Sequence, residues 1–433
     1  MNVTADWNID RSMLINECLE ALALVLEYDM NDNTTHQHAI RVGEGCVLIG
    51  HKLGLPPATL QKMYYAGLLH DVGKISVDPR LLGRKGRLSE EEFNIVKTHT
   101  IFGSRILAAL PGLSEMSLWV RWHHEWWNGT GYPDGLIKTE IPLEVQILST
   151  VDCFDSLQSP RLDRDRRSQA EAFRIMEDER GTHFNPDMLD SVLEMVHEKT
   201  LLPGESSPKF LELKEEYLTT PLSKYSSEYW QGSGMAALHP ILRLFARVID
   251  AKHKYTRGHS TRVAYLSKFI AEKMGLPVDH ILQIEVAGLL HDAGKVSVSL
   301  EILDKPAPPD ANEWEVIRMH PQKSLDILLH ISSLQDIAAI AASHHERYDG
   351  KGYPKGLKGD EIPILSRVIA VADSYDAMTS NRAYRKGMPA EIAYNKIKDG
   401  ISTQFDPKIT KAFLDISPKY IQALFSMYEV EDV

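Results

Sequence analysis

The sequence predicts an all-α protein made of two tandem helical bundles related by internal duplication. The segment GLLHDVGKISV, which begins at Gly67, returns as GLLHDAGKVSV at Gly288 with two substitutions. Apolar residues recur with helical spacing in both copies, and strand-like alternation is confined to KISV and KVSV at the ends of these two segments. Each copy is too long for a solenoid repeat, so we expect each copy to be a domain.

Every repeated motif is displaced by the same 221 residues that separate Gly67 from Gly288. HHEWWNGTGYP at His123, for example, returns as HHERYDGKGYP at His344. The match continues without a gap across residues 38–186 of the first copy. A shared register of this length is the signature of a duplicated domain.

Three segments of the second copy carry the clearest helical patterns. VDHILQIEVAGLLHD, ANEWEVIRMHPQKSLDILLH and LQDIAAIAASHHE each place their apolar residues along one helix face. Gly73 and Gly294 sit where a helix would stop. Between the copies, PGESSPKF and YSSEYWQGSGM are rich in Ser, Gly and Pro, whereas LELKEEYLTT looks more helical. We predict an N-terminal domain at residues 1–204, a linker at 205–235 and a C-terminal domain at 236–433.

The composition limits the partners and the location that we expect. The 433 residues carry a net charge of −12, which argues against DNA and anionic membranes as general partners. Cys18, Cys46 and Cys153 form no CxxC pair, a pattern typical of a reducing compartment. The first residues lack a basic region followed by an apolar one, so we expect no signal peptide, and no apolar run approaches the roughly 18 residues of a spanning helix. We therefore expect a cytoplasmic protein that neither binds DNA nor inserts into a membrane.

Five histidines and two aspartates suited to metal binding recur in each copy. Imidazole and carboxylate are ligands of iron, manganese and zinc, and seven groups suit two ions with a bridging aspartate. A single histidine on a helix is more often a surface or capping residue, but the recurrence of the whole set at unchanged spacing favours a metal site. The predicted ligands are His259, His291, Asp292, His320, His344, His345 and Asp373 in the second copy, and His38, His70, Asp71, His99, His123, His124 and Asp152 in the first.

HDAGK, HHERYDGKGYP and DSYDAMTSNRAYR follow one another between about Tyr255 and Pro407. In this order they resemble the HD-GYP family of metal-dependent phosphodiesterases within the HD superfamily. The resemblance implies HD-type all-α domains with two divalent transition metals per site, iron first and manganese as the alternative. It also implies hydrolysis of a cyclic dinucleotide, either cyclic di-GMP or cyclic GMP-AMP, to a linear product. The choice of substrate, the choice of metal, the oligomeric state and the input signal stay open.

The resemblance assigns roles to residues of the second copy. Asp292 would be shared between the two metals, and Lys295 would hold a phosphate oxygen as a point charge. One metal would be held by His259, His291, Asp292 and Asp373, and the other by His320, His344, His345 and Asp292. The implied substrate contacts are Lys295, Gly352, Tyr353, Pro354, Arg382, Tyr384 and Arg385, with Lys74 as the counterpart in the first copy. Tyr255 and Thr34 occupy the position where some members carry a glutamate for a third metal, so we predict a binuclear site.

The first copy keeps every predicted ligand but differs at the expected substrate edge. The differing pairs, with the first copy named first, are Asn128 and Asp349, Asn185 and Asp406, Asp163 and Tyr384, Trp126 and Arg347, and Trp127 and Tyr348. Asp163 would repel an anionic dinucleotide. We therefore predict catalysis in the C-terminal domain and a regulatory or substrate-shaping role for the N-terminal one. A second working site with altered preference is the alternative.

Two other functions stay open. One is a nucleotidase or phosphomonoesterase of broader specificity, because HD-type dinuclear sites also cleave nucleotides; the GYP turn and NRAYR argue against it as the sole activity. The other is a non-catalytic receptor for a cyclic dinucleotide, or a scaffold that binds protein partners through the GYP loops. This second function suits the N-terminal copy better than the C-terminal one.

Overall fold

The computed structural model shows two compact helical units, one within residues 10–232 and one built on residues 233–433. It describes residues 16–23, 38–84, 86–108, 110, 113–159, 167–201, 207–218, 239–251, 258–381 and 385–429. These residues form helices, turns and a few isolated β-bridges, with no strand among them. The predicted all-α class is confirmed. No helix in the described part of the chain has the length and apolar character needed to cross a membrane.

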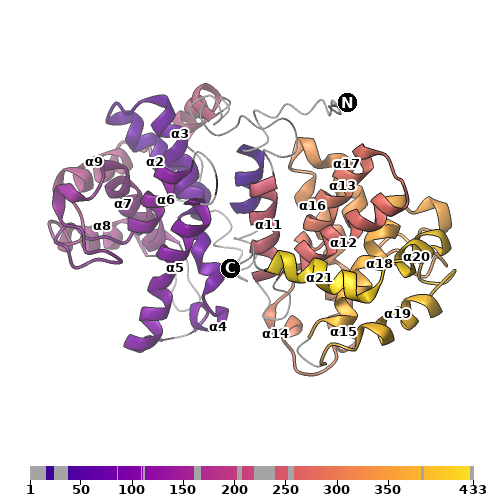
Figure 1. Cartoon of the computed structure of the whole chain (residues 1–433). Coiled ribbons are helices and arrows are strands. Elements are labelled where there is room, and N and C mark those ends of the chain that lie inside the picture. The colour runs from indigo at the N-terminus through magenta and orange to yellow at the C-terminus, as the bar shows by residue number, and fades with distance from the viewer. Residues whose placement is uncertain are drawn as a thin grey trace. The chain divides into compact units, whose positions relative to one another are not determined.

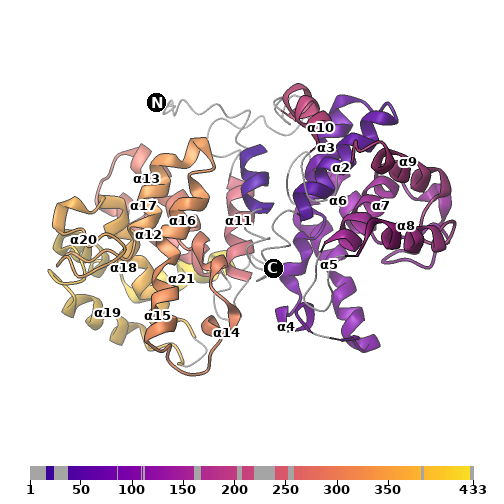
Figure 2. The same cartoon turned by 180° about the vertical axis from the view of Figure 1, so that it is seen from behind.

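The N-terminal unit is a bundle in which α2, α3 and α7 pack on one another (Figures 1 and 2). A further helical segment, residues 16–23, contributes the buried side chains of Leu19 and Leu22. The helices are α2 (His38–Lys52), α3 (Pro57–Leu69), η2 (Val72–Ser76), α4 (Pro79–Leu82), α5 (Glu90–Ala108), α6 (Ser114–Trp122), η3 (Lys138–Glu140), α7 (Leu143–Gln158), α8 (Gln169–Asp178), α9 (Pro186–His197), α10 (Pro208–Leu213) and the π-helical turn η4 (Lys214–Leu218).

Part of the segment expected to link the domains lies against the N-terminal bundle. Helix α10 contacts α2, and η4 contacts α3. The ring of Phe210 is buried and stacks on Tyr64 with 5.9 Å between centroids. Residues 202–206 and 219–238 lie outside the described part, so the predicted domain boundaries stay a prediction.

The C-terminal unit repeats this arrangement with α12, α13 and α18 in the places of α2, α3 and α7 (Figures 1 and 2). Helix α12 packs along α13 and α18, and α16 packs on η7 and α17. The helices are α11 (His239–Ala251), α12 (His259–Lys273), α13 (Val278–Leu290), η7 (Ala293–Ser297), α14 (Leu300–Leu303), α15 (Ala311–Arg318), α16 (His320–Leu328), η8 (Ser332–Leu334), α17 (Gln335–Ala342), η9 (Gly359–Glu361), α18 (Ile364–Thr379), α19 (Ala390–Asp399), α20 (Pro407–Leu414) and α21 (Pro418–Glu429).

Two local expectations were wrong. The segment ANEWEVIRMHPQKSLDILLH forms two helices, α15 and α16, which meet at Met319. Pro321 explains the break, because proline lacks an N–H and its ring crowds the carbonyl four residues earlier; the first copy has Thr100 at this position and keeps one helix, α5. KVSV is not strand-like either, because Lys295, Val296 and Ser297 belong to the 3-10 turn η7. The side chains of Val296 and Val298 are both buried.

Gly294 marks the closest approach of two segments near the site. A Cβ atom at this position would lie 2.0 Å from the carbonyl oxygen of His320 and 2.5 Å from the backbone nitrogen of Ser324. The Gly294 N–H also donates to the Ser324 hydroxyl at 2.8 Å. The glycine in HDAGK therefore allows η7 to touch the first turn of α16.

We expect Gly294→Ala to destabilise the C-terminal unit by about 1–3 kcal/mol, because backbone atoms would have to move apart. The measurement is the midpoint of urea-induced unfolding of the full chain. Lys411→Ala, at an exposed position on α20, is the control and should stay within about 0.5 kcal/mol of the unchanged protein. Equal midpoints for the two variants would contradict the predicted close approach.

Candidate metal centre

The C-terminal unit gathers all seven predicted ligands, six of them at or next to the ends of neighbouring helices. His259 begins α12, His291 and Asp292 directly follow α13, and His320 begins α16. The remaining three come from the end of α17 and from the middle of α18, and they are His344, His345 and Asp373. Ligand atoms within 4.8 Å of one another form one group of His259, His291 and Asp373 and another of His320, His344 and His345, and a third group, His291, Asp292 and His344, joins these two.

Asp292 stands between these two groups, and each of its oxygens faces one of them. Its Oδ2 lies 3.4 Å from Nε2 of both His259 and His291. Its Oδ1 lies 3.3 Å from Nε2 of His320 and 3.8 Å from Nε2 of His344. The carboxylate is 2% exposed, so these imidazoles and the Lys295 ammonium, which also contacts Oδ2, are its immediate surroundings.

Backbone carbonyls orient most of the imidazoles. His291, His320 and His344 each donate Nδ1–H to the carbonyl three residues earlier, at 2.8, 2.6 and 2.5 Å. This contact leaves Nε2 directed toward Asp292. A histidine that ligates a metal usually has its second nitrogen held in this way, because the contact fixes the tautomer and the ring orientation.

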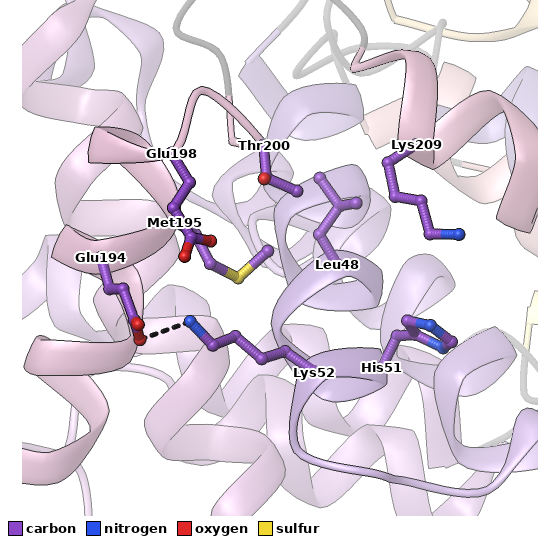
Figure 3. Close-up of a pocket in the computed structure, with 8 residues that line it drawn as sticks. All are labelled: Leu48, His51, Lys52, Glu194, Met195, Glu198, Thr200 and Lys209. Atoms are coloured by element: carbon purple, nitrogen blue, oxygen red, sulfur yellow. Dashed lines mark hydrogen bonds and ion pairs between the residues drawn. The ribbon is translucent and has the colours of Figure 1, made fainter.

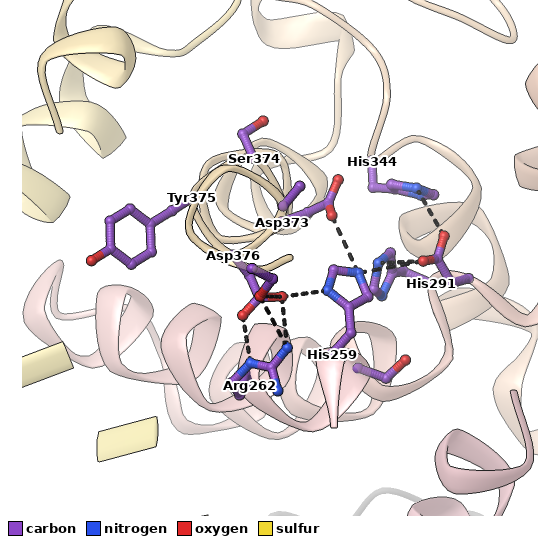
Figure 4. A network of polar contacts seen from close by, with 12 residues as sticks. His259, Arg262, His291, His344, Asp373, Ser374, Tyr375 and Asp376 are labelled. Atoms are coloured by element: carbon purple, nitrogen blue, oxygen red, sulfur yellow. Dashed lines mark hydrogen bonds and ion pairs between the residues drawn. The ribbon is translucent and has the colours of Figure 1, made fainter. Parts of the chain in front are cut away.

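His259 is held by a carboxylate that the sequence analysis did not single out. Its Nδ1 donates to Oδ2 of Asp376 at 2.6 Å, while its Nε2 lies 3.4 Å from Asp373 (Figure 4). Arg262 in turn donates to both oxygens of Asp376, at 2.6 and 3.1 Å. In both copies an aspartate follows the predicted aspartate ligand by three residues, which is one helix turn and a signal that could have identified Asp376.

The charges in the cluster are arranged to keep the carboxylates ionised. Burial alone would raise the pKa of Asp292, but His291 and Lys295 hold it well below the usual range. Burial lowers the pKa of His345 to about 3, with a further contribution from His320. Neutral imidazoles and ionised carboxylates are the forms that ligate a metal.

Several buried ligand atoms have no hydrogen-bond partner among the described residues. They include Nε2 of His259 and of His291, and Oδ1 of Asp292. Such atoms cost free energy unless something satisfies them. Since all three face one small volume and belong to ligand types that bind transition metals, the residues fit a metal centre.

The N-terminal unit builds the same constellation with a more exposed centre. Nε2 of His70 lies 3.4 Å from Oδ2 of Asp71, and Nε2 of His99 lies 3.5 Å from Oδ1. His38 contacts Asp152 at 3.3 Å and Asp155 at 2.7 Å, as His259 contacts its two aspartates. Two ligand groups again form, His38 with His70 and Asp152, and His99 with His123 and His124. The side chain of Asp71 is 26% exposed, compared with 2% for Asp292.

The GYP turn of the C-terminal unit is fastened to the histidine pair. A Cβ on Gly352 would lie 2.3 Å from the backbone nitrogen of Arg347, so only glycine allows this approach. The Tyr353 ring lies 4.9 Å from the His345 ring, and the Tyr353–Pro354 peptide is cis. Glu346, which the sequence analysis also left out, is 4% exposed and accepts the backbone N–H groups of Lys355 and Leu357. The recurrence of HHE in both copies was its signal.

The predicted substrate contacts are only partly placed by the structure. Lys295 lies at the cluster, where its ammonium contacts Asp292, and Lys74 contacts Asp71 in the same way. The guanidinium of Arg385 donates to the carbonyl of Ala377 at 2.8 Å, at the end of α18. The other two predicted contacts, Arg382 and Tyr384, lie outside the described residues, as does Asp163 of the first copy.

The interpretation of Asp406 as part of the substrate edge was wrong. Asp406 is 6% exposed, begins α20 as its N-cap and forms an ion pair of 2.6 Å with Arg367. In the first copy Asn185 caps α9 and donates to Gln146 at 2.8 Å. Gln146 is the counterpart of Arg367, so the two substitutions replace an ion pair by a neutral pair and concern the framework.

The difference at Asp349 is compensated in a similar way. Its carboxylate forms an ion pair of 2.9 Å with Arg347, and the first copy replaces both residues, by Asn128 and Trp126. The Trp126 ring stacks on His183 with 4.6 Å between centroids. The first copy thus lacks both the negative charge of Asp349 and the positive charge of Arg347, and the net charge of the pair is unchanged.

A cavity of about 310 Å³ in the N-terminal unit lies outside both ligand groups (Figure 3). An ion pair of 2.5 Å joins Lys52 and Glu194 across it. Its lining residues are Leu48, His51, Lys52, Glu194, Met195, Glu198, Thr200 and Lys209. None of them is a predicted ligand, so the cavity is unrelated to the metal centre.

A family model described as the HD domain matches the chain twice, at residues 25–188 and 243–409. The chain belongs to the HD domain family. Each match contains one of the two constellations, which confirms the predicted membership of the HD superfamily and the tandem duplication. The crystal structure of a cyclic GMP-AMP specific phosphodiesterase of Vibrio cholerae has a TM-score of 0.62 and 25% identity, and the match covers 93% of this chain and 98% of that chain.

Curated relatives of the chain are also named as cyclic dinucleotide phosphodiesterases. The chain is 33% identical over 288 residues to the 3'3'-cGAMP-specific phosphodiesterase 3 of Vibrio cholerae, and 38% identical over 197 residues to a cyclic di-GMP phosphodiesterase of Thermotoga maritima. These matches cover 66% and 45% of this HD-domain chain. The chain spans 59% and 53% of the length of these two relatives.

We expect Asp376→Asn to lower the metal content of the C-terminal HD domain, because the amide cannot hold His259 as an ionised carboxylate does. Loss of such an outer contact typically costs 10–100-fold in metal affinity. The measurement is metal per chain at limiting metal concentration, determined by elemental analysis. Asp415→Asn, at an exposed position on the same domain, is the control. Equal metal content in the two variants would contradict this role.

Proposed function

We propose that the chain is a metal-dependent phosphodiesterase that hydrolyses a cyclic dinucleotide to a linear dinucleotide at its C-terminal HD domain. The observation that carries the proposal is the buried carboxylate of Asp292, whose Oδ2 faces His259 and His291 and whose Oδ1 faces His320 and His344. The names of the relatives support a cyclic dinucleotide, either cyclic GMP-AMP or cyclic di-GMP, as the substrate.

The ligand groups suit two divalent transition metals, iron first and manganese as the alternative. With three side chains on each side of Asp292, each ion would be held by four protein ligands, fewer than transition metals of this kind can take. When bound, two such ions would supply a water of lowered pKa and would neutralise charge on the phosphodiester. The ligands that we propose are His259, His291 and Asp373 for one ion, His320, His344 and His345 for the other, and Asp292 for both.

The chain's own residues position the reaction. Hydrolysis adds one water to the phosphorus and breaks one P–O bond of the ring, so one anionic oxygen needs a cation beside it as the bond breaks. Lys295 is 15% exposed and contacts Asp292, which places its ammonium at the edge of the ligand groups. We assign it to a phosphate oxygen. Tyr353, fixed against His345, borders the same space.

We propose that the N-terminal HD domain keeps its metals and has a regulatory or substrate-shaping role. Its two ligand groups match two of the three in the C-terminal domain. The greater exposure of Asp71 supports a non-catalytic role, because electrostatic catalysis is strongest where water is excluded. We place the protein in the cytoplasm, since the described cysteines are all free, and we expect neither DNA nor a membrane among its partners. Protein partners would meet the GYP loops.

We expect Asp292→Ala to reduce hydrolysis of both cyclic dinucleotides by more than about 100-fold, a larger effect than loss of an outer contact. The measurement is chromatographic detection of linear product with purified, metal-loaded protein. Asp71→Ala, the matched change in the N-terminal domain, should retain turnover at the C-terminal site. Full activity of Asp292→Ala would contradict the proposed function, and equal losses in the two variants would contradict the division of roles.

A further inference from the structure

The GYP loops of the two domains differ in charge in a way that the ligand groups do not. The C-terminal loop reads DGKGYPKGLKGDE and carries Lys351, Lys355 and Lys358. The N-terminal loop reads NGTGYPDGLIKTE, and the aligned positions are Thr130, Asp134 and Ile137. All three lysines are exposed.

The acidic residues around the C-terminal loop are engaged elsewhere. Asp349 pairs with Arg347 at 2.9 Å, and Asp360 pairs with Arg367 at 2.7 Å. The buried glutamate Glu346 accepts backbone N–H groups of the loop, and Glu361 accepts the backbone N–H of residue 358 at 2.9 Å.

The ammonium groups of the three loop lysines therefore form no ion pair within the described part of the chain. Lys351 is attracted to Asp349 over a longer range and lowers its pKa, after the larger contribution of Arg347. The lysine charges are thus available to a ligand.

The N-terminal loop shows the opposite arrangement. Asp134 is held by Arg121, which donates to both carboxylate oxygens at 2.7 Å, and by the indole N–H of Trp122 at 2.7 Å. The C-terminal unit has Ala342 and Ser343 in place of these donors. The acidic residue of the N-terminal turn is thus neutralised by an internal ion pair, while the C-terminal loop presents lysines that form no ion pair with the described residues. Lys138, which aligns with a glycine, is the one basic residue that the N-terminal loop adds.

Two of the three lysines lie close to the site in sequence. Lys351 and Lys355 lie two residues before and after Tyr353, so their backbones lie within roughly 7 Å of it. The Tyr353 N–H donates to the carbonyl of His345 at 3.2 Å. Both copies also place a cation over the tyrosine of the GYP turn. Arg318 lies 5.6 Å from the ring centroid of Tyr353, and its counterpart Lys97 lies 5.5 Å from that of Tyr132. This contact therefore does not distinguish the two loops.

We propose that the lysines of the C-terminal loop attract the anionic cyclic dinucleotide and thereby direct it to this domain rather than to the N-terminal one. This inference rests on the proposed function. A cyclic dinucleotide carries two phosphodiester charges, and the chain as a whole carries −12, so the substrate meets overall repulsion and needs local attraction. Charges near a site mouth act mainly on association, over about 8 Å at physiological ionic strength.

The test is the triple variant Lys351→Gln, Lys355→Gln, Lys358→Gln. We expect kcat/KM for the cyclic dinucleotide to fall about 10-fold at low ionic strength, with kcat and metal content unchanged. The loss should vanish near 1 M salt, where screening acts within about 3 Å. The control, Lys396→Gln, Lys398→Gln, Lys411→Gln, removes the same charge from exposed positions of α19 and α20.

The outcomes separate the two proposals. Absence of hydrolysis by the unchanged, metal-loaded protein would refute the proposed function itself. If the unchanged protein hydrolyses the dinucleotide but the triple variant shows the same dependence of kcat/KM on salt, the loop does not attract the substrate. Its lysines then serve another ligand, such as an acidic protein. Equal losses in the loop and control variants would assign the effect to net charge and would also overturn the inference.

Discussion

The contact of one buried carboxylate with the imidazoles around it is the constraint on which the C-terminal unit depends. Asp292 is almost fully enclosed, and an isolated ionised carboxylate in such a place would be very costly. Its cost is offset because α12, α13 and α16 each bring a positive or polar group to it. The helices of the bundle must therefore meet where their ends can reach this one residue.

The same constraint explains which parts of the two copies were kept. The ligands, the carbonyl contacts of the imidazoles and the aspartates behind His38 and His259 recur together, because a change in any one would misplace a buried charge. The surface of the GYP loop faces no such requirement. There the copies differ at three aligned positions, Lys351, Lys355 and Lys358 against Thr130, Asp134 and Ile137, in line with the division of roles proposed for the two domains.

Much of the fold and of the centre could be predicted because the duplication supplied an internal comparison. Repetition at one offset singled out the histidines and aspartates that the structure brings together, and helical spacing predicted the fold class. Asp376 and Glu346 were missed because their importance depends on partners that only the folded chain brings close: α12 for the aspartate and the GYP turn for the glutamate. Asp406 was misassigned for the same reason, since its partner Arg367 lies on another helix. KVSV was misread because the tight turn after α13 outweighs the β-propensity of two valines.

The exchange of the Asp406–Arg367 ion pair for the Asn185–Gln146 amide pair has a consequence for building hybrids of the two domains. The two members of each pair lie 39 residues apart. Arg367 lies on α18 and Asp406 directly before α20, whereas Gln146 lies on α7 and Asn185 directly before α9. A hybrid joined between these helices would set Arg367 against an amide, or Gln146 against an ionised aspartate. Hybrids whose crossover points take both members of a pair from the same parent domain keep these contacts matched, whereas crossover points chosen only for exposure can separate them.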